Sequence, residues 1–94
     1  MLYAAKCYWP QVTTRELELA AGRAACEAQR VSSTGPNVTY VGSMLFAADE
    51  LVLCLFESSS PAVVKDINER AGIPCERVMQ SQWLACPLNG RDQR

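Results

Sequence analysis

The stretch that decides the fold is residues 51–56, Leu51-Val52-Leu53-Cys54-Leu55-Phe56. We interpret it as a β-strand, in which successive side chains point to opposite faces of a sheet. Both alternating sets of side chains are apolar here, so both faces of the sheet need cover. The chain offers two helices, which suffice for one face. The other face is expected to meet a second copy of the protein, a ligand, or both.

The sequence on either side alternates between strand and helix patterns. Strand patterns bounded by turn residues cover residues 2–9, 38–46, 51–56 and 78–84. A helix pattern begins at Thr13 or Thr14, follows a stripe of mostly alanine, and ends in the turn cluster 32–36. A second helix pattern begins with a serine cap before Pro61 and ends at Gly72.

The order strand, helix, strand, strand, helix, strand consists of two right-handed crossover units. It predicts an α+β, ferredoxin-like βαββαβ domain, with a four-stranded antiparallel sheet and both helices on one face. This single domain is expected to span residues 2–86, and residues 87–94 are expected to form a polar C-terminal tail.

Composition narrows the function classes. Hydrophobic residues make up 49% of the 94 residues and charged residues 20%, which is typical of a globular chain and not of a disordered one. The net charge is -1 and no basic stripe is present, which argues against nucleic-acid binding. No apolar run approaches the roughly 20 residues of a membrane span, and no signal-peptide pattern precedes the first strand. We expect a soluble, cytoplasmic protein without membrane contact.

The five cysteines stand far apart and none forms a C-x-x-C pair, so we interpret them as buried, reduced thiols. The chain contains no histidine, which removes the commonest metal ligand and general base. We therefore expect no bound metal and no cofactor.

Several segments resemble one protein family over about residues 2–85. The segments are Pro10-Gln11-Val12-Thr13, Val38-Thr39-Tyr40-Val41-Gly42-Ser43, Cys54-Leu55-Phe56-Glu57, Ala62-Val63, Ala71-Gly72-Ile73-Pro74 and Glu76-Arg77-Val78. They resemble a short bacterial ferredoxin-like family, long described as a domain of unknown function, of the dimeric α+β barrel type. That family includes a nickel-binding, nickel-responsive member, and the resemblance implies the same fold.

The chain departs from the family pattern at positions that matter for a metal. Many members carry an acidic and then a basic residue in the first strand, where this chain has Lys6 and Cys7, and a histidine where it has Gly42. Nickel requires imidazole or carboxylate donors, and a nearby ammonium opposes the cation. We interpret the family's metal site as degraded in this chain.

Two pairs of residues suggest a binding cavity. Lys6 and Tyr8 share one face of the first strand, and Tyr40 and Gly42 share one face of the next. If both faces point away from the helices, they line one cavity at the centre of a dimer. An ammonium, two phenols and the gap at Gly42 would bind a mostly apolar anion or carbonyl compound. Alternatively, Lys6 reaches the rim and the tyrosines simply pack.

Cys54 and Glu57 complete the predicted ligand-binding residues. Cys54 would be a nucleophile only if a nearby base or cation lowered its pKa, and Lys6 is the cation that the sequence offers. Otherwise Cys54 is a buried structural thiol. Glu57 would be a general base if desolvated, and otherwise lies at the rim or near the next helix start. Trp9 and Trp83 are expected to be core or dimer-edge anchors, or a platform for an aromatic ligand.

Two functions of different classes remain open. The first is a small homodimeric protein that binds a small apolar molecule or a partner without catalysis. The second is a cofactor-independent enzyme of the dimeric α/β-barrel kind, such as an isomerase, cyclase or monooxygenase acting on an apolar intermediate. Such an enzyme would use sparse polar groups in a dry cavity, here Lys6, Tyr8, Tyr40 and Glu57. The sequence does not decide between them.

Overall fold

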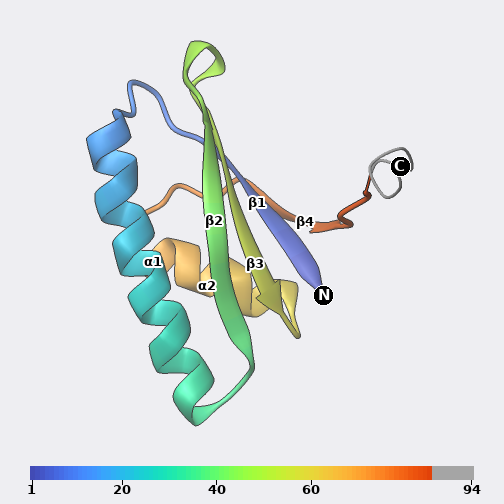
Figure 1. Cartoon of the computed structure of the whole chain (residues 1–94). Helices are drawn as coiled ribbons and strands as arrows, with labels where there is room; N and C mark the ends of the chain where they lie inside the picture. Colours follow the sequence, from blue (N-terminus) through green and yellow to red (C-terminus); the bar gives the residue numbers. More distant parts are fainter. Residues whose placement is uncertain (86–94) are drawn as a thin grey trace, which may run out of the picture.

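One antiparallel sheet with the strand order β2-β3-β1-β4 runs through the protein (Figure 1). A computed structural model describes residues 1–85; Cys86 and the predicted tail 87–94 lie outside the described residues. The elements are β1 (Leu2–Tyr8), α1 (Thr14–Thr34), β2 (Val38–Phe46), the 3-10 turn η1 (Ala47–Asp49), β3 (Leu51–Ser58), α2 (Pro61–Arg70) and β4 (Arg77–Ser81). This confirms the predicted βαββαβ order and the ferredoxin-like α+β fold.

The doubly apolar strand β3 lies between β1 and β2, and its two faces have different neighbours. Val52, Cys54 and Phe56 point toward the helices and are fully buried. Leu51, Leu53 and Leu55 point to the other face and keep partial exposure to solvent. We call this second surface the open face of the sheet.

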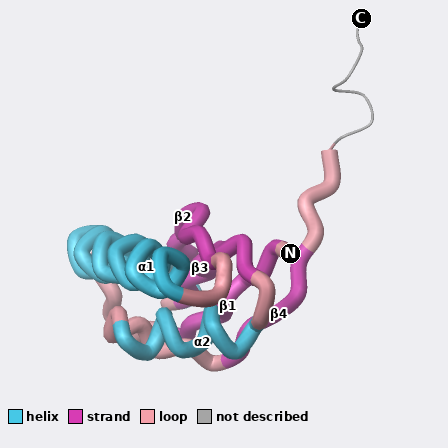
Figure 2. The backbone as a smooth tube through the Cα atoms, turned by 90° about the horizontal axis from the view of Figure 1, so that it is seen from below, coloured by secondary structure: helices cyan, strands magenta, loops and turns pink. Residues whose placement is uncertain are grey.

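Both helices lie on the same side of the sheet and pack against each other (Figure 2). The helix α1 covers β2 with small side chains, among which Ala20, Ala24 and Ala28 are buried. The helix α2 lies against the other three strands and buries Val64 and Ile67. The core therefore sits between the helices and one sheet face. No helix among residues 1–85 is long and apolar enough to cross a membrane.

The helix starts agree with the sequence signals. Thr13 caps α1 in a capping box, because its hydroxyl accepts from the Glu16 amide while the Glu16 carboxylate accepts from the Thr13 amide. Ser60 caps α2 and Pro61 occupies its first turn. Gly72, with φ of 76°, follows α2 in the left-handed conformation that glycine adopts without strain.

Two element ends differ most from the prediction. The helix α1 continues through the expected turn residues, because the Ser32 hydroxyl donates to the Ala28 carbonyl and the Ser33 hydroxyl donates to the Arg30 carbonyl, at 2.9 and 2.8 Å. The strand β4 ends at Ser81, so residues 82–84 are not part of the sheet.

Candidate functional site

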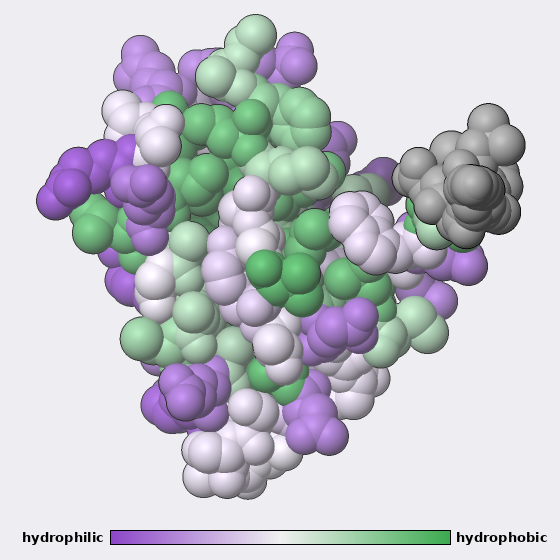
Figure 3. Space-filling view, in the orientation of Figure 1, coloured by the Kyte–Doolittle hydropathy of each residue, from purple (hydrophilic) through white to green (hydrophobic). Residues whose placement is uncertain are grey.

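The open face of the sheet carries apolar side chains that neither helix covers. Its side chains are fixed by strand register, since Leu53 pairs with Lys6 and Met44, and Leu55 pairs with Ala4 and Gly42. Beyond the three β3 leucines, apolar side chains on this face include Leu2, Tyr8, Val41, Met44, Phe46 and Met79. Figure 3 shows green, apolar surface in the middle and upper part of the molecule, interrupted by polar residues.

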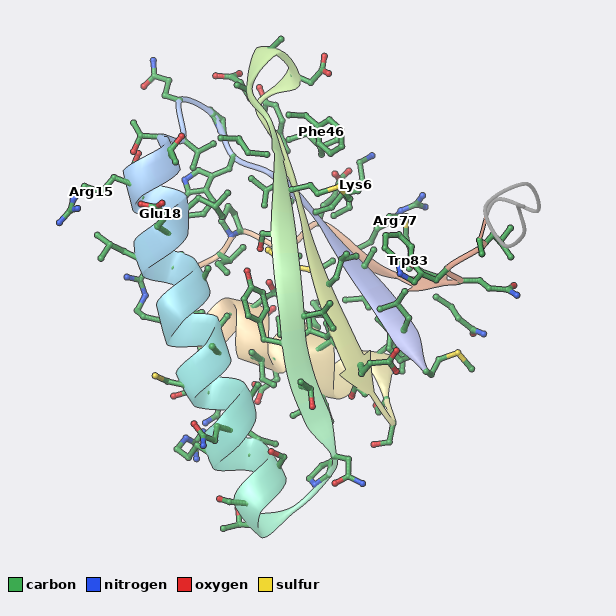
Figure 4. All side chains as sticks on the ribbon, in the orientation of Figure 1. Lys6, Arg15, Glu18, Phe46, Arg77 and Trp83 are labelled. Carbon is green, nitrogen blue, oxygen red and sulfur yellow. The ribbon has the colours of Figure 1, made fainter. Side chains whose placement is uncertain are left out.

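Lys6 lies on this face as expected, but it already has charged neighbours. Its ammonium is 3.8 Å from the Glu76 carboxylate, and Arg77 lies directly opposite it on β4. In Figure 4, Lys6, Arg77, Phe46 and Trp83 lie on the side of the sheet away from α1. Lys6 is thus part of a basic pair at the β1–β4 side of the open face.

Tyr8, Glu57 and Gly42 also belong to the open face. The Tyr8 hydroxyl donates to Glu50 at 3.3 Å, which places it at the end of the face. The Glu57 carboxylate is 3.1 Å from the amino-terminal ammonium, at the opposite end of β3. A Cβ added at Gly42 would meet no atom within 4 Å, so the expected gap at this position is present.

Tyr40 and Cys54 do not join them, and the expected pairing of Tyr40 with Gly42 on one face is wrong. A β-bulge places Val41 between the paired residues Tyr40 and Gly42, so position 40 faces the helices with Phe56 and position 42 faces the open side with Leu55. The Tyr40 ring packs on Phe56 with centroids 5.3 Å apart. Lys6, Tyr8, Tyr40 and Glu57 therefore do not converge on one cavity within a single chain.

The helix side of the sheet instead holds a chain of hydroxyl and thiol groups. The Tyr40 and Ser43 hydroxyls are 2.5 Å apart, and the Ser43 hydroxyl donates to the Cys54 sulfur at 3.2 Å. Burial raises the pKa of Tyr40. Hydrogen bonding from Cys7, with a further contribution from Ser43, lowers the pKa of Cys54 against the effect of its burial. Lys6 plays no part in activating Cys54, because the two residues face opposite sides of the sheet.

A pocket of about 500 Å³ opens on the open face, near the end of β3 that carries Glu57. It is lined by Leu2, Val41, Leu55, Glu57, Ser81, Gln82 and Trp83. The size suits a small organic molecule, and the lining is mostly apolar with one carboxylate. Sequence analysis placed Glu57 in the site but missed most of the other residues.

The two tryptophans have different environments. Trp9 is partly buried against the core, as an anchor would be. Trp83 is 82% exposed and follows the end of β4, with its ring at the edge of the pocket. The sequence contains one sign that Trp83 lies outside the sheet. The polar residues Gln80, Ser81 and Gln82 come directly before it, and such a run does not continue a buried strand well.

The strand order, the two helices on one face and the apolar open face define a ferredoxin-like α+β protein. The sequence profile of the family described as "Nickel responsive protein SCO4226-like" matches residues 8–80, and the chain belongs to this SCO4226-like family. The predicted family is thereby confirmed.

A solved structure supports the same fold. The crystal structure of SCO4226 from Streptomyces coelicolor A3(2) superposes with a TM-score of 0.72 at 20% sequence identity, covering 90% of this chain and all of the other. At this identity the likeness concerns the fold. A comparison with curated proteins found no significant sequence match.

The residues of this chain do not fit a nickel site of the kind that the family description suggests for SCO4226. The chain has no histidine, and no three Cys, Asp or Glu side chains in residues 1–85 are placed to hold a metal ion. The open face presents Lys6 and Arg77 at its β1–β4 side, and two cations there oppose a divalent ion.

Proposed function

We propose that the protein is a homodimer, joined through the open faces of two sheets, that binds a small apolar molecule in the pocket beside Trp83. The observation that carries the proposal is the set of exposed apolar side chains on the open face. Met44 and Phe46 are 43% and 40% exposed, and they adjoin the partly exposed leucines of β3. Exposed apolar side chains that gather on one face of a soluble protein mark an interaction site.

A second copy of the chain suits this surface because the charges on it are complementary end to end. Lys6 and Arg77 lie at the β1–β4 side, whereas Glu57 lies at the end of β3. In a two-fold interface the same surface of both copies is in contact, so Arg77 of one copy can lie toward the partner's Glu57, while Lys6 keeps its ion pair with Glu76 of its own chain. The apolar rows then pack against each other between these ends.

The pocket gives the dimer a ligand-binding role. Leu2, Leu55 and Val41 supply apolar walls, and the exposed Trp83 ring supplies a flat apolar surface. The pocket opens toward the face that the partner would cover, so dimerisation would enclose a bound molecule and remove it from water. An apolar ligand gains most from this enclosure.

Sedimentation equilibrium tests the dimer. Wild-type protein at micromolar concentration is expected at twice the chain mass of 10.3 kDa. Leu53→Glu should be monomeric, since the new carboxylate is tolerated beside Lys6 in the free chain but not inside an apolar interface. Leu19→Glu is the matched control, because Leu19 is a 53% exposed leucine on α1 and its substitution should leave the dimer intact. A monomeric wild-type protein contradicts the proposal.

Titration with Nile red, a neutral apolar dye, tests the pocket. We expect saturable fluorescence enhancement, with an apparent dissociation constant at least about tenfold weaker for Trp83→Ala. Leu84→Ala is the control, since Leu84 is 79% exposed but does not line the pocket. Equal binding by wild type and Trp83→Ala would show that the pocket is not the binding site, whatever the oligomeric state.

A further inference from the structure

Three cysteines that are distant in the sequence come together on the helix side of the sheet. Cys7 lies on β1 and Cys54 on β3, and the register that pairs Ala5 with Cys54 gives both the same face on adjacent strands. Cys75 lies in the segment between α2 and β4. The Glu76 amide donates to the Lys6 carbonyl at 2.8 Å, which brings Cys75 beside β1. The Cys7 thiol donates to the Ala5 carbonyl at 3.5 Å, and Cys54 and Cys75 are both near enough to raise its pKa.

The three thiols differ in their access to solvent. Cys7 and Cys54 are fully buried, with exposed fractions of 0%. Cys75 is partly exposed while it packs against the core. A small oxidant therefore meets Cys75 before it meets Cys7 or Cys54.

Backbone geometry favours one of the possible pairings. Cys7 and Cys54 are diagonal neighbours on two hydrogen-bonded strands, where Cα atoms are about 7–8 Å apart. A disulfide requires about 4.4–6.8 Å, and the ladder holds both strands in place. Cys75 lies in an irregular segment, residues 73–76, that can adjust without breaking a ladder.

We propose that Cys7 and Cys75 form a reversible disulfide when the protein meets a hydroperoxide. The Cys75 thiol loses its proton to water, and the thiolate attacks the outer peroxide oxygen. The O–O bond breaks, and the leaving alkoxide or hydroxide takes up a proton and departs as alcohol or water. The Cys7 sulfur then attacks the resulting sulfenic acid, and the hydroxide that leaves takes the Cys7 proton as water. Two thiols are oxidised, and one peroxide is reduced. The site does not depend on the proposed dimer, because it lies on the opposite side of the sheet.

Peptide mapping tests the pairing, since trypsin separates the three cysteines into residues 7–15, 31–65 and 71–77. The Cys26→Ser, Cys86→Ser protein is treated with hydrogen peroxide, and remaining thiols are blocked before digestion. We expect the 7–15 and 71–77 peptides joined, with the loss of two hydrogens and full reversal by dithiothreitol. A joined pair that includes 31–65, an irreversibly oxidised Cys75, or no oxidation would each overturn the proposal.

Two variants test the order of steps. Cys7→Ser removes the resolving thiol, so the Cys75 sulfenic acid should persist and be trapped by dimedone on residues 71–77. Cys54→Ala should still form the disulfide, because Cys54 takes no part in the two steps. Loss of the disulfide in folded Cys54→Ala protein would show that oxidation passes through Cys54, and absence of a dimedone adduct in Cys7→Ser would show that Cys75 is not attacked first.

Discussion

The substitution Lys6→Met distinguishes a surface lysine from one that an interface must accommodate. In the free chain two opposing effects act on Lys6. Its ion pair with Glu76 is half-exposed, with side-chain exposures of 36% and 55%, so solvent screening limits its contribution to a few tenths of a kcal/mol. Arg77 lies directly opposite, and such a like-charge pair destabilises by about 0.2–1 kcal/mol. The free energy of unfolding of the monomer should change by less than about 1 kcal/mol.

The dimer should respond much more strongly. Burying a polar group without full compensation costs about 1–3 kcal/mol, and each dimer would bury two copies of Lys6. Methionine of similar length removes this cost, so we expect the dimer to tighten by about 2–6 kcal/mol, or roughly 30- to 20,000-fold in dissociation constant. If Lys6 instead bound a ligand, Lys6→Met would weaken ligand binding and would not be expected to tighten the dimer.

Sedimentation equilibrium over a dilution series gives the dissociation constant, and urea unfolding at two protein concentrations separates fold stability from association. Lys65→Met is the matched control, since Lys65 is exposed on α2 away from the open face. A weaker dimer in Lys6→Met would refute the reasoning, because it would mean that Lys6 meets a carboxylate across the interface. Equal effects in both variants would refute the placement of the interface.

Three further predictions concern the fold that supports these surfaces. Phe56→Ala should lower the free energy of unfolding by about 3–5 kcal/mol, measured by urea unfolding, because it leaves a cavity in the core and removes the ring contact with Tyr40. A loss below about 1 kcal/mol would contradict this packing. Thr13→Ala should lower the free energy of unfolding by about 1 kcal/mol in the same measurement, because Thr13 caps α1. Thr14→Ala should lower it much less, and equal losses in the two variants would contradict the capping role. Because burial raises the pKa of Tyr40 above its ordinary value of 10.0, the unfolded chain loses this proton first and stability falls as pH rises through that value. Tyr40→Phe should reduce this alkaline loss in unfolding curves followed against pH, and an unchanged pH dependence would oppose the assignment.

The order of elements could be predicted because each boundary has a local cause. The Thr13 cap, the Ser60–Pro61 start of α2 and the glycine after α2 act within a few residues of chain, so they can be recognised without knowledge of the tertiary structure. The predicted end of α1 was wrong, although it also rested on a local signal. Serines usually favour turns, but here Ser32 and Ser33 satisfy carbonyls of their own helix, and the helix continues.

The composition of the site was harder to predict, because it depends on which residues pair across the sheet. One extra residue in β2 turns Tyr40 to the helix side, and alternation along the sequence gives no direct sign of it. Gly42 was the available signal, since an isolated glycine in a strand often marks a bulge. The pocket at Trp83 depends on where β4 stops, which is set by pairing with β1 and not by the residues of β4 alone.

The bulge at Val41 also affects how the protein avoids aggregation. β2 is an edge of the sheet, and a long regular edge offers free amides and carbonyls to strands of other molecules. The extra residue interrupts that repeat, and a bulge increases local twist. The other edge, β4, is only five residues long. Growth by adding strands, as in an amyloid fibril, is therefore disfavoured at both edges, while the apolar surface of the sheet stays free to find a specific partner.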